Sequence, residues 1–373
     1  MEVEKTPLRV RVENGIMHHR LLLGSTALVG ASLLFAGAAR AQDGGLEVIL
    51  GGFSEFGITA ATDDTLDGSS RNHNYAFFND HELIVRVNGV TDGGINYGSK
   101  VEIEVGGEPG GDVSIDEVGL FFSGNFGRVE LGRDDGAEDL MFVGAEDAQA
   151  GTGGLDGDTA NLGRIQFQDS GDAIKATYFT PRVAGFQLGF SWTPDGDDNT
   201  NGRGNTQFLG GDARKDIGGG GINWVGILGP VDLTLSAVGI FAEVKGGNAQ
   251  QTGAGFKDDQ RAFAFGGLLG FGGLEFGAGY NHQKGPSDDD DGELVSLGLA
   301  YGFGPANVSV GYEHDWNDNL DNTNIFVVSG DVGLMPGVTL KSDVSYNTED
   351  PQKNEGGGSG STLAGVLTVQ LDY

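Results

Sequence analysis

The sequence contains no cysteine, and it has only 22 lysine and arginine residues against 54 aspartate and glutamate residues. The lack of cysteine excludes a disulfide framework and any metal site built on thiolates. The shortage of basic residues leaves a formal net charge of −32 at pH 7. This charge disfavours nucleic acid as a partner, because nucleic acid binding requires a basic surface that displaces phosphate counterions.

Long apolar runs are also scarce, and the one clear example lies near the start of the chain. A basic cluster at residues 18–20 precedes an apolar run at residues 21–39, and residues 39–41 (Ala-Arg-Ala) have the small-x-small pattern of a cleavage site. We therefore expect residues 1–41 to be an export signal. A transmembrane anchor is the alternative, although several glycine and serine residues interrupt the run.

The same region sets two further boundaries. Residues 1–16 are polar and fit no part of a signal, which indicates that Met17 is the true translation start. The mature region, residues 42–373, lacks a second run of about eighteen apolar residues, so we expect no membrane-spanning helix in it.

Glycine, in contrast, is abundant, with 69 residues spread along the chain. High glycine content and high charge are typical of disordered chains. The hydrophobic content of 38%, with 22 phenylalanines placed in alternating runs, instead favours folded strands. The even spacing favours one large β unit over the two or three soluble domains that the length allows.

Short turn signals alternate with longer polar stretches throughout the mature region. Glycine and proline allow a chain to reverse direction within a few residues. Seven such signals occur, at residues 91–94, 124–127, 181–185, 227–230, 271–273, 303–305 and 334–337. Eight longer stretches occur, at about 61–75, 106–113, 133–172, 194–216, 243–260, 284–292, 317–323 and 348–360. Seven turns and eight loops would join sixteen strands, with the short connections on one rim and the long ones on the other.

The intervening segments alternate between apolar and polar residues. At the end of the chain, Leu367, Val369 and Leu371 fall on one side of a strand, and Thr368 and Gln370 fall on the other. The same alternation occurs in residues 76–88, 95–105, 186–192 and 338–347. Unpaired charges cannot fill a dry core. We therefore predict an all-β fold, a 16-stranded antiparallel transmembrane β-barrel with a wet interior, short periplasmic turns and long extracellular loops.

Some segments and some other folds complicate this prediction. Residues 217–227 are rich in glycine, and residues 324–333 fit a strand with either face inward. A soluble β-sandwich would also alternate, and local pattern alone does not exclude it. A calcium β-roll would need tandem Gly-Gly-x-Gly-x-Asp repeats, which the sequence lacks.

The richest candidate for a functional site is the long loop that begins at Arg133. A barrel of sixteen strands leaves a wide aqueous channel, so we expect this loop to fold inward and narrow it. The candidate acids at the constriction are Asp134, Asp135, Glu138, Asp139, Glu146 and Asp147. Ordinary solvation of an external loop is the alternative reading of these acids.

Basic residues on nearby strands would face these acids and create a field across the channel. The candidates lie on polar faces of the predicted strands, namely Arg86, Lys100, Arg128 and Lys175, and Arg164 follows the loop. Alternatively, each of them simply pairs with an acid of the lumen, such as Glu82, Glu102 or Glu130.

Other acidic runs, at residues 195–198 and 288–291, lie in loops. Oxygen clusters of this kind attract hard divalent cations, so loosely bound Ca²⁺ is one hypothesis, and a solvated loop is the other. No EF-hand spacing, nucleophile elbow or His-Glu-x-x-His helix occurs. We therefore expect neither an enzyme nor a tightly bound cofactor.

Three segments resemble Gram-negative general (diffusion) porins, in particular the alphaproteobacterial type. They are residues 50–56, 116–133 and 184–192. The ending Gly-Arg-Val-Glu-Leu-Gly-Arg at residues 127–133 leads directly into the long third loop, as it does in that family. The resemblance covers the mature chain, although Tyr373 stands where phenylalanine is usual.

The resemblance implies a homotrimer in the outer membrane, with the third loop as an internal constriction. The loop acids and Arg128 match the family motif by position. The expected function is a water-filled channel for passive diffusion of small hydrophilic solutes and ions, in contact with outer-membrane lipid and preferring cations. A substrate-selective channel for a sugar or an anion is the alternative, and a structural or adhesin barrel with a plugged lumen is a third reading.

Overall fold

The computed structural model describes residues 39–40, 45–62, 74–105, 113–157, 159, 167, 169–196, 214–244, 259–285, 291–317, 322–350 and 360–373. Apart from β1 (Ala39–Arg40), which pairs with β2, the predicted export signal lies outside these residues and stays a prediction. Among the described residues, no helix combines the length and apolar character that crossing a membrane requires.

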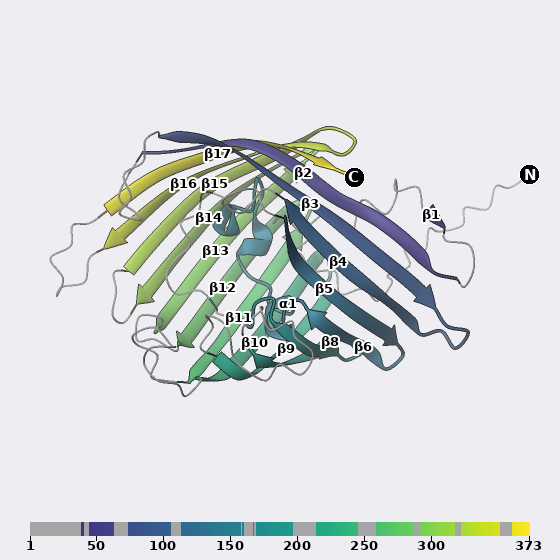
Figure 1. The fold of residues 1–373 in the computed structure, drawn as a ribbon. Coiled ribbons are helices and arrows are strands. Elements are labelled where there is room, and N and C mark those ends of the chain that lie inside the picture. Colours follow the sequence, from purple (N-terminus) through teal and green to yellow (C-terminus); the bar gives the residue numbers. More distant parts are fainter. Residues whose placement is uncertain are drawn as a thin grey trace, which may run out of the picture.

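Sixteen antiparallel strands form one continuous sheet that closes on itself (Figure 1). They are β2 (Glu47–Ala61), β3 (Tyr75–Val90), β4 (Asn96–Val105), β5 (Val113–Gly124), β6 (Gly127–Arg133), β7 (Ile174–Phe179), β8 (Phe186–Asp195), β9 (Arg214–Leu228), β10 (Val231–Val244), β11 (Gln260–Phe271), β12 (Leu274–Lys284), β13 (Gly292–Phe303), β14 (Ala306–Asn317), β15 (Asn322–Met335), β16 (Val338–Asp350) and β17 (Gly360–Asp372).

The last strand closes the barrel against the first. β17 pairs antiparallel with β2, and the backbone N–H of Tyr373 donates to the carbonyl of Gly52 at 3.1 Å. Closure pairs the edges that an open sheet would expose. The predicted 16-stranded barrel is therefore confirmed, and its strands meet at the seven short turns and eight longer connections that the sequence indicated.

The two faces of the barrel differ as the alternation predicted. Leu367 and Val369 of β17 are 47% and 43% exposed on the outside, whereas Thr368 and Gln370 are each 1% exposed on the inside. The other strands repeat this arrangement, with apolar side chains on the outer surface and polar ones within. This distribution places the low-dielectric medium outside the barrel and water within it.

The structure also decides the register of β15, which the sequence left open. Ile325 and Val327 point inward and are buried, while Phe326 and Val328 point outward. Two further apolar residues therefore face inward, beside other buried apolar residues of the inner wall such as Val238 and Leu294. The inward position of Ile325 and Val327 has a local cause, because Leu155 of the long connection between β6 and β7 packs against both of them.

Residues 134–157, the first part of the connection between β6 and β7, lie inside the barrel (Figure 1). Their short helical turns are α1 (Ala137–Leu140), η3 (Glu146–Ala148) and η4 (Gly154–Asp156). We call residues 134–157 the infolded segment. Small residues dominate its contact face, and Ala137, Ala145 and Ala148 have no exposed surface.

Candidate pore constriction

Glycines on the inner wall allow the infolded segment to approach the strands closely. A Cβ added at Gly266, Gly277 or Gly298 would lie 2.0, 2.3 or 2.2 Å from successive carbonyl oxygens of the segment, those of residues 143, 144 and 145. These three glycines, on β11, β12 and β13, form the glycine track. Such short distances leave no space for any side chain, so only glycine permits this contact.

Hydrogen bonds from inward-facing side chains then fix the segment to the wall. The N–H of Val143 donates to Ser236 Oγ at 2.9 Å, and the N–H of Ala150 donates to Ser309 Oγ at 2.8 Å. Further along, the carboxylate of Asp343 on β16 accepts from the N–H of Thr152 at 3.2 Å, from its hydroxyl and from the N–H of Gly154. The segment is thus attached from β10 to β16.

Two of the predicted constriction acids accept hydrogen bonds that help to hold the infolded segment in its conformation. Glu138 is fully buried and accepts hydrogen bonds from the N–H of Ser170 at 3.1 Å and from Ser191 Oγ at 2.5 Å. Asp147 is also buried and accepts from the N–H of Gly144 at 2.7 Å. Both buried carboxylates therefore stabilise the conformation of the loop.

The predicted basic residues lie on β3, β4, β6 and β7, close to carboxylates of the wall and of the infolded segment. Lys100 Nζ lies 3.3 Å from Glu102, 3.7 Å from Asp134 and in contact with Glu117. Arg86 lies 3.8 Å from Glu102.

Arg128 and Lys175 are also occupied. Arg128 Nε donates to Glu130 Oε1, and its guanidinium lies 4.3 Å from the centre of the Phe121 ring. Lys175 Nζ donates to the carbonyls of Asp134 and Gly171. Arg164 lies outside the described residues. Nearby carboxylates therefore offset the charges of Arg86, Lys100 and Arg128 before these residues could form a free positive wall.

Asp135, at the start of the infolded segment, belongs to a group of three neighbouring acids. Carboxylate oxygens of Glu117, Asp135 and Asp172 all lie within 4.8 Å of one another. Burial, together with the charge of Asp116, raises the pKa of Asp172 to about 6. Burial and the charge of Asp139 raise the pKa of Asp135 well above its usual value. Like charges crowded in a partly dry site favour the protonated form.

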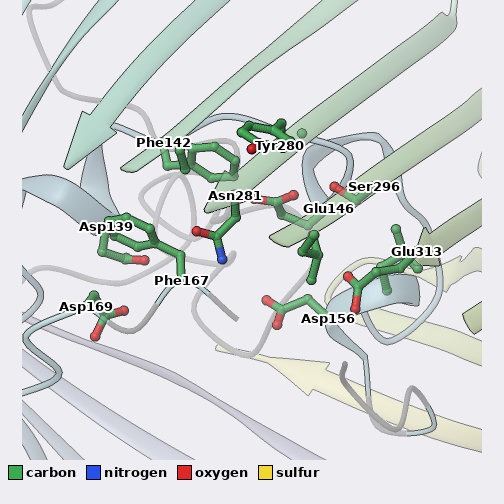
Figure 2. Close-up of a pocket in the computed structure, with 14 residues that line it drawn as sticks. Asp139, Phe142, Glu146, Asp156, Phe167, Asp169, Tyr280, Asn281, Ser296 and Glu313 are labelled. Atoms are coloured by element: carbon green, nitrogen blue, oxygen red, sulfur yellow. The ribbon is translucent and has the colours of Figure 1, made fainter. Parts of the chain in front are cut away.

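Asp139 and Glu146 line a cavity between the infolded segment and the wall strands β11 to β14 (Figure 2). The cavity has a volume of about 210 Å³. Its described lining contains five carboxylates and no lysine or arginine. The five are Asp139, Glu146, Asp156, Asp169 and Glu313.

A protein-family model described as Gram-negative porin matches residues 24–352. The chain belongs to the Gram-negative porin family. A comparison with curated proteins found no match. Among solved structures, a double mutant of the Rhodopseudomonas blastica porin is 16% identical with a TM-score of 0.61, over 87% of this chain and 100% of that one. An anion-selective porin from Comamonas acidovorans is 18% identical with a TM-score of 0.61, over 88% and 100%. At this level of identity the two structures show a shared fold.

Membership of the family establishes this porin as a non-enzymatic diffusion channel of the outer membrane. Its apolar outer face contacts lipid, and small solutes pass through its lumen. Sequence reasoning missed Asn281 and Glu313 as lining residues, and it missed the glycine track. The sequence does place Asn281, Glu313 and the glycine track on the inward faces of alternating strands. This position becomes informative only when the path of the loop is known.

The raised pKa of Asp172 predicts a pH-dependent current. As the pH falls through about 6, Asp172 gains a proton, so the lumen loses negative charge and the ratio of cation to anion current should fall. Asp172→Asn should lower the ratio at pH 7.5 and flatten this step. Reversal potentials in a KCl gradient at pH 7.5 and pH 5 measure both effects. The control Asp232→Asn changes an exposed carboxylate on β10 and should keep the pH-dependent change in the current ratio. If this change disappeared in the control, the effect would have to be assigned to surface charge.

Proposed function

We propose that this porin passes small hydrophilic solutes and ions by passive diffusion, with cations preferred over anions. The observation that carries the proposal is the cavity beside the infolded segment, whose described lining bears five carboxylates and no base. Negative charge held at a narrow point of a water-filled barrel lowers the energy of a passing cation and raises that of an anion.

The pairing of the basic residues also supports a preference for cations. The ammonium of Lys100 lies within 4 Å of carboxyl oxygens of Glu102, Glu117 and Asp134, so a single basic group faces three acidic ones. Arg86 and Arg128 are likewise close to Glu102 and Glu130. The strands that carry these basic residues therefore supply little net positive potential to attract anions.

Reversal potentials of the purified porin in planar bilayers, measured across a KCl gradient, test this proposal. We expect cations to permeate at least ~3-fold better than anions, because lumen potentials of this kind reach a few kT. Replacing three lining acids together, with Asp139→Asn, Glu146→Gln and Asp156→Asn, should bring the ratio close to unity. Asp232→Asn, on an exposed carboxylate away from the cavity, should leave it unchanged. A wild-type channel that prefers anions would contradict the proposal.

The oligomer is a separate part of the proposal, and we infer a homotrimer. The family resemblance supports it, and so does the broad apolar outer face, which offers a surface for a second copy as well as for lipid. Native mass spectrometry of the detergent-solubilised porin should give three times the mass of the monomer. A monomeric mass across several mild detergents would refute a trimer.

A further inference from the structure

The amide of Asn281 lies inside the acidic cavity without a partner. Asn281 is only 4% exposed, and neither its Oδ1 nor its Nδ2 makes a hydrogen bond. It belongs to the inner face of β12, and its side chain points into the space between the infolded segment and the wall (Figure 2). A buried amide left unpaired is unfavourable, so a solute that satisfies both of its polar atoms gains binding energy there.

The surroundings of this amide define the solute further. Carboxylates of the loop and of β14 favour positive charge, and they disfavour an anion. Phe142, Leu155 and Leu294 add apolar surface to the same lining. A bare inorganic ion would use neither the apolar surface nor the donor of the amide. A neutral polyol could donate hydrogen bonds to the carboxylates, but it would gain no attraction between opposite charges.

We propose that this cavity is a binding subsite for small organic cations that carry a primary ammonium and a hydroxyl group on a short apolar chain. This proposal rests on the proposed channel function. The ammonium donates to lining carboxylates and to Asn281 Oδ1. The hydroxyl oxygen accepts from Asn281 Nδ2, and the chain lies against Phe142 and Leu294. Such solutes pause in the lumen during passage and interrupt the ion current.

Three solutes of nearly equal length but different charge show how much the positive charge of the solute contributes to binding. 4-Amino-1-butanol, 1,4-butanediol and 4-hydroxybutyrate carry charges of about +1, 0 and −1 near neutral pH. Added to single wild-type channels in KCl, the amino alcohol should interrupt the current at a concentration at least ~10-fold lower than the other two, since tenfold corresponds to ~1.4 kcal/mol. Tetramethylammonium, a cation without N–H donors, should also be weaker.

Two variants at Asn281 connect this block to the amide. Asn281→Leu keeps the approximate volume, removes both polar atoms, and should raise the half-blocking concentration of the amino alcohol roughly 5- to 10-fold. Asn281→Asp, recorded at about pH 9 so that the new carboxyl group is ionised, adds negative charge and should lower this concentration. The matched control is Asn223→Leu, because Asn223 is a buried inward amide of β9 that does not line the cavity. The amino alcohol should block this control variant at the same concentration as it blocks the wild type.

The outcomes separate the subsite from the channel. A wild-type protein without ohmic conductance would refute the proposed function itself. A conducting channel that the diol blocks as well as the amino alcohol would overturn the subsite only. An unchanged block in Asn281→Leu, or an equal change in Asn223→Leu, would also overturn it.

Discussion

Replacing Gly266, Gly277 and Gly298 together by alanine is expected to lift the infolded segment from the barrel wall and to raise the single-channel conductance. Each new methyl group would lie between 2.0 and 2.3 Å from a backbone carbonyl oxygen, so the backbone of residues 143–145 must move. Overpacking of this kind costs roughly 1–3 kcal/mol at each site, and three sites together exceed what the few hydrogen bonds of this stretch return.

The expected increase in conductance is roughly twofold or more, because a barrel of this strand number is wide once nothing narrows it. Selectivity between cations and anions should fall at the same time, since Asp139 and Glu146 move with the segment. The matched control is Gly270→Ala on the same strand as Gly266, where the new methyl group would meet its nearest atom at an ordinary 3.6 Å. Wild-type conductance in the triple variant, together with an altered control, would contradict the role of the glycine track.

Substitution of Asp343 by asparagine is expected to release the second half of the infolded segment. The carboxylate accepts from two backbone N–H groups and from a hydroxyl, and it has no exposed surface. An asparagine has only one acceptor oxygen, and its NH₂ would face donors. Hydrogen bonds to a charged group contribute roughly 1.5–3 kcal/mol each, so the loss is large compared with the other contacts of residues 151–154.

Limited proteolysis and current recordings measure this release. The variant should be cleaved within residues 150–157 under conditions that leave the wild type intact, and its current should fluctuate between levels. Asp315→Asn provides the control, because Asp315 is an equally buried inward carboxylate that accepts from the N–H and hydroxyl of Thr323 on the next strand. Cleavage of both variants at the same rate would assign the effect to general destabilisation of the barrel.

The strands and their connections could be predicted because their signals are local. The alternation of Leu367, Thr368, Val369 and Gln370 depends only on the two-residue period of a strand. Short turns with glycine or proline and longer polar stretches mark the reversals in alternation. A barrel with lipid outside must then place its polar face inward. The number of strands, the closure of β17 on β2 and the sign of the net charge therefore follow from the sequence.

The geometry inside the lumen could not be predicted in this way, because it depends on contacts between residues far apart in the chain. Residues 143–145 meet Gly266, Gly277 and Gly298 only after the barrel has closed. The same closure brings Glu138 to Ser191 of β8, while Asp139 and Glu146 border the cavity.

The amino-acid sequence by itself determined the barrel, its wet interior and its acidic character, since each is the sum of short-range patterns. Only the tertiary structure decided which acids face the channel, which basic residues are already paired, and that the amide of Asn281 makes no hydrogen bond. The physical reason is that the field and the shape of a channel depend on distances across the lumen, and those distances are set by packing rather than by spacing along the chain.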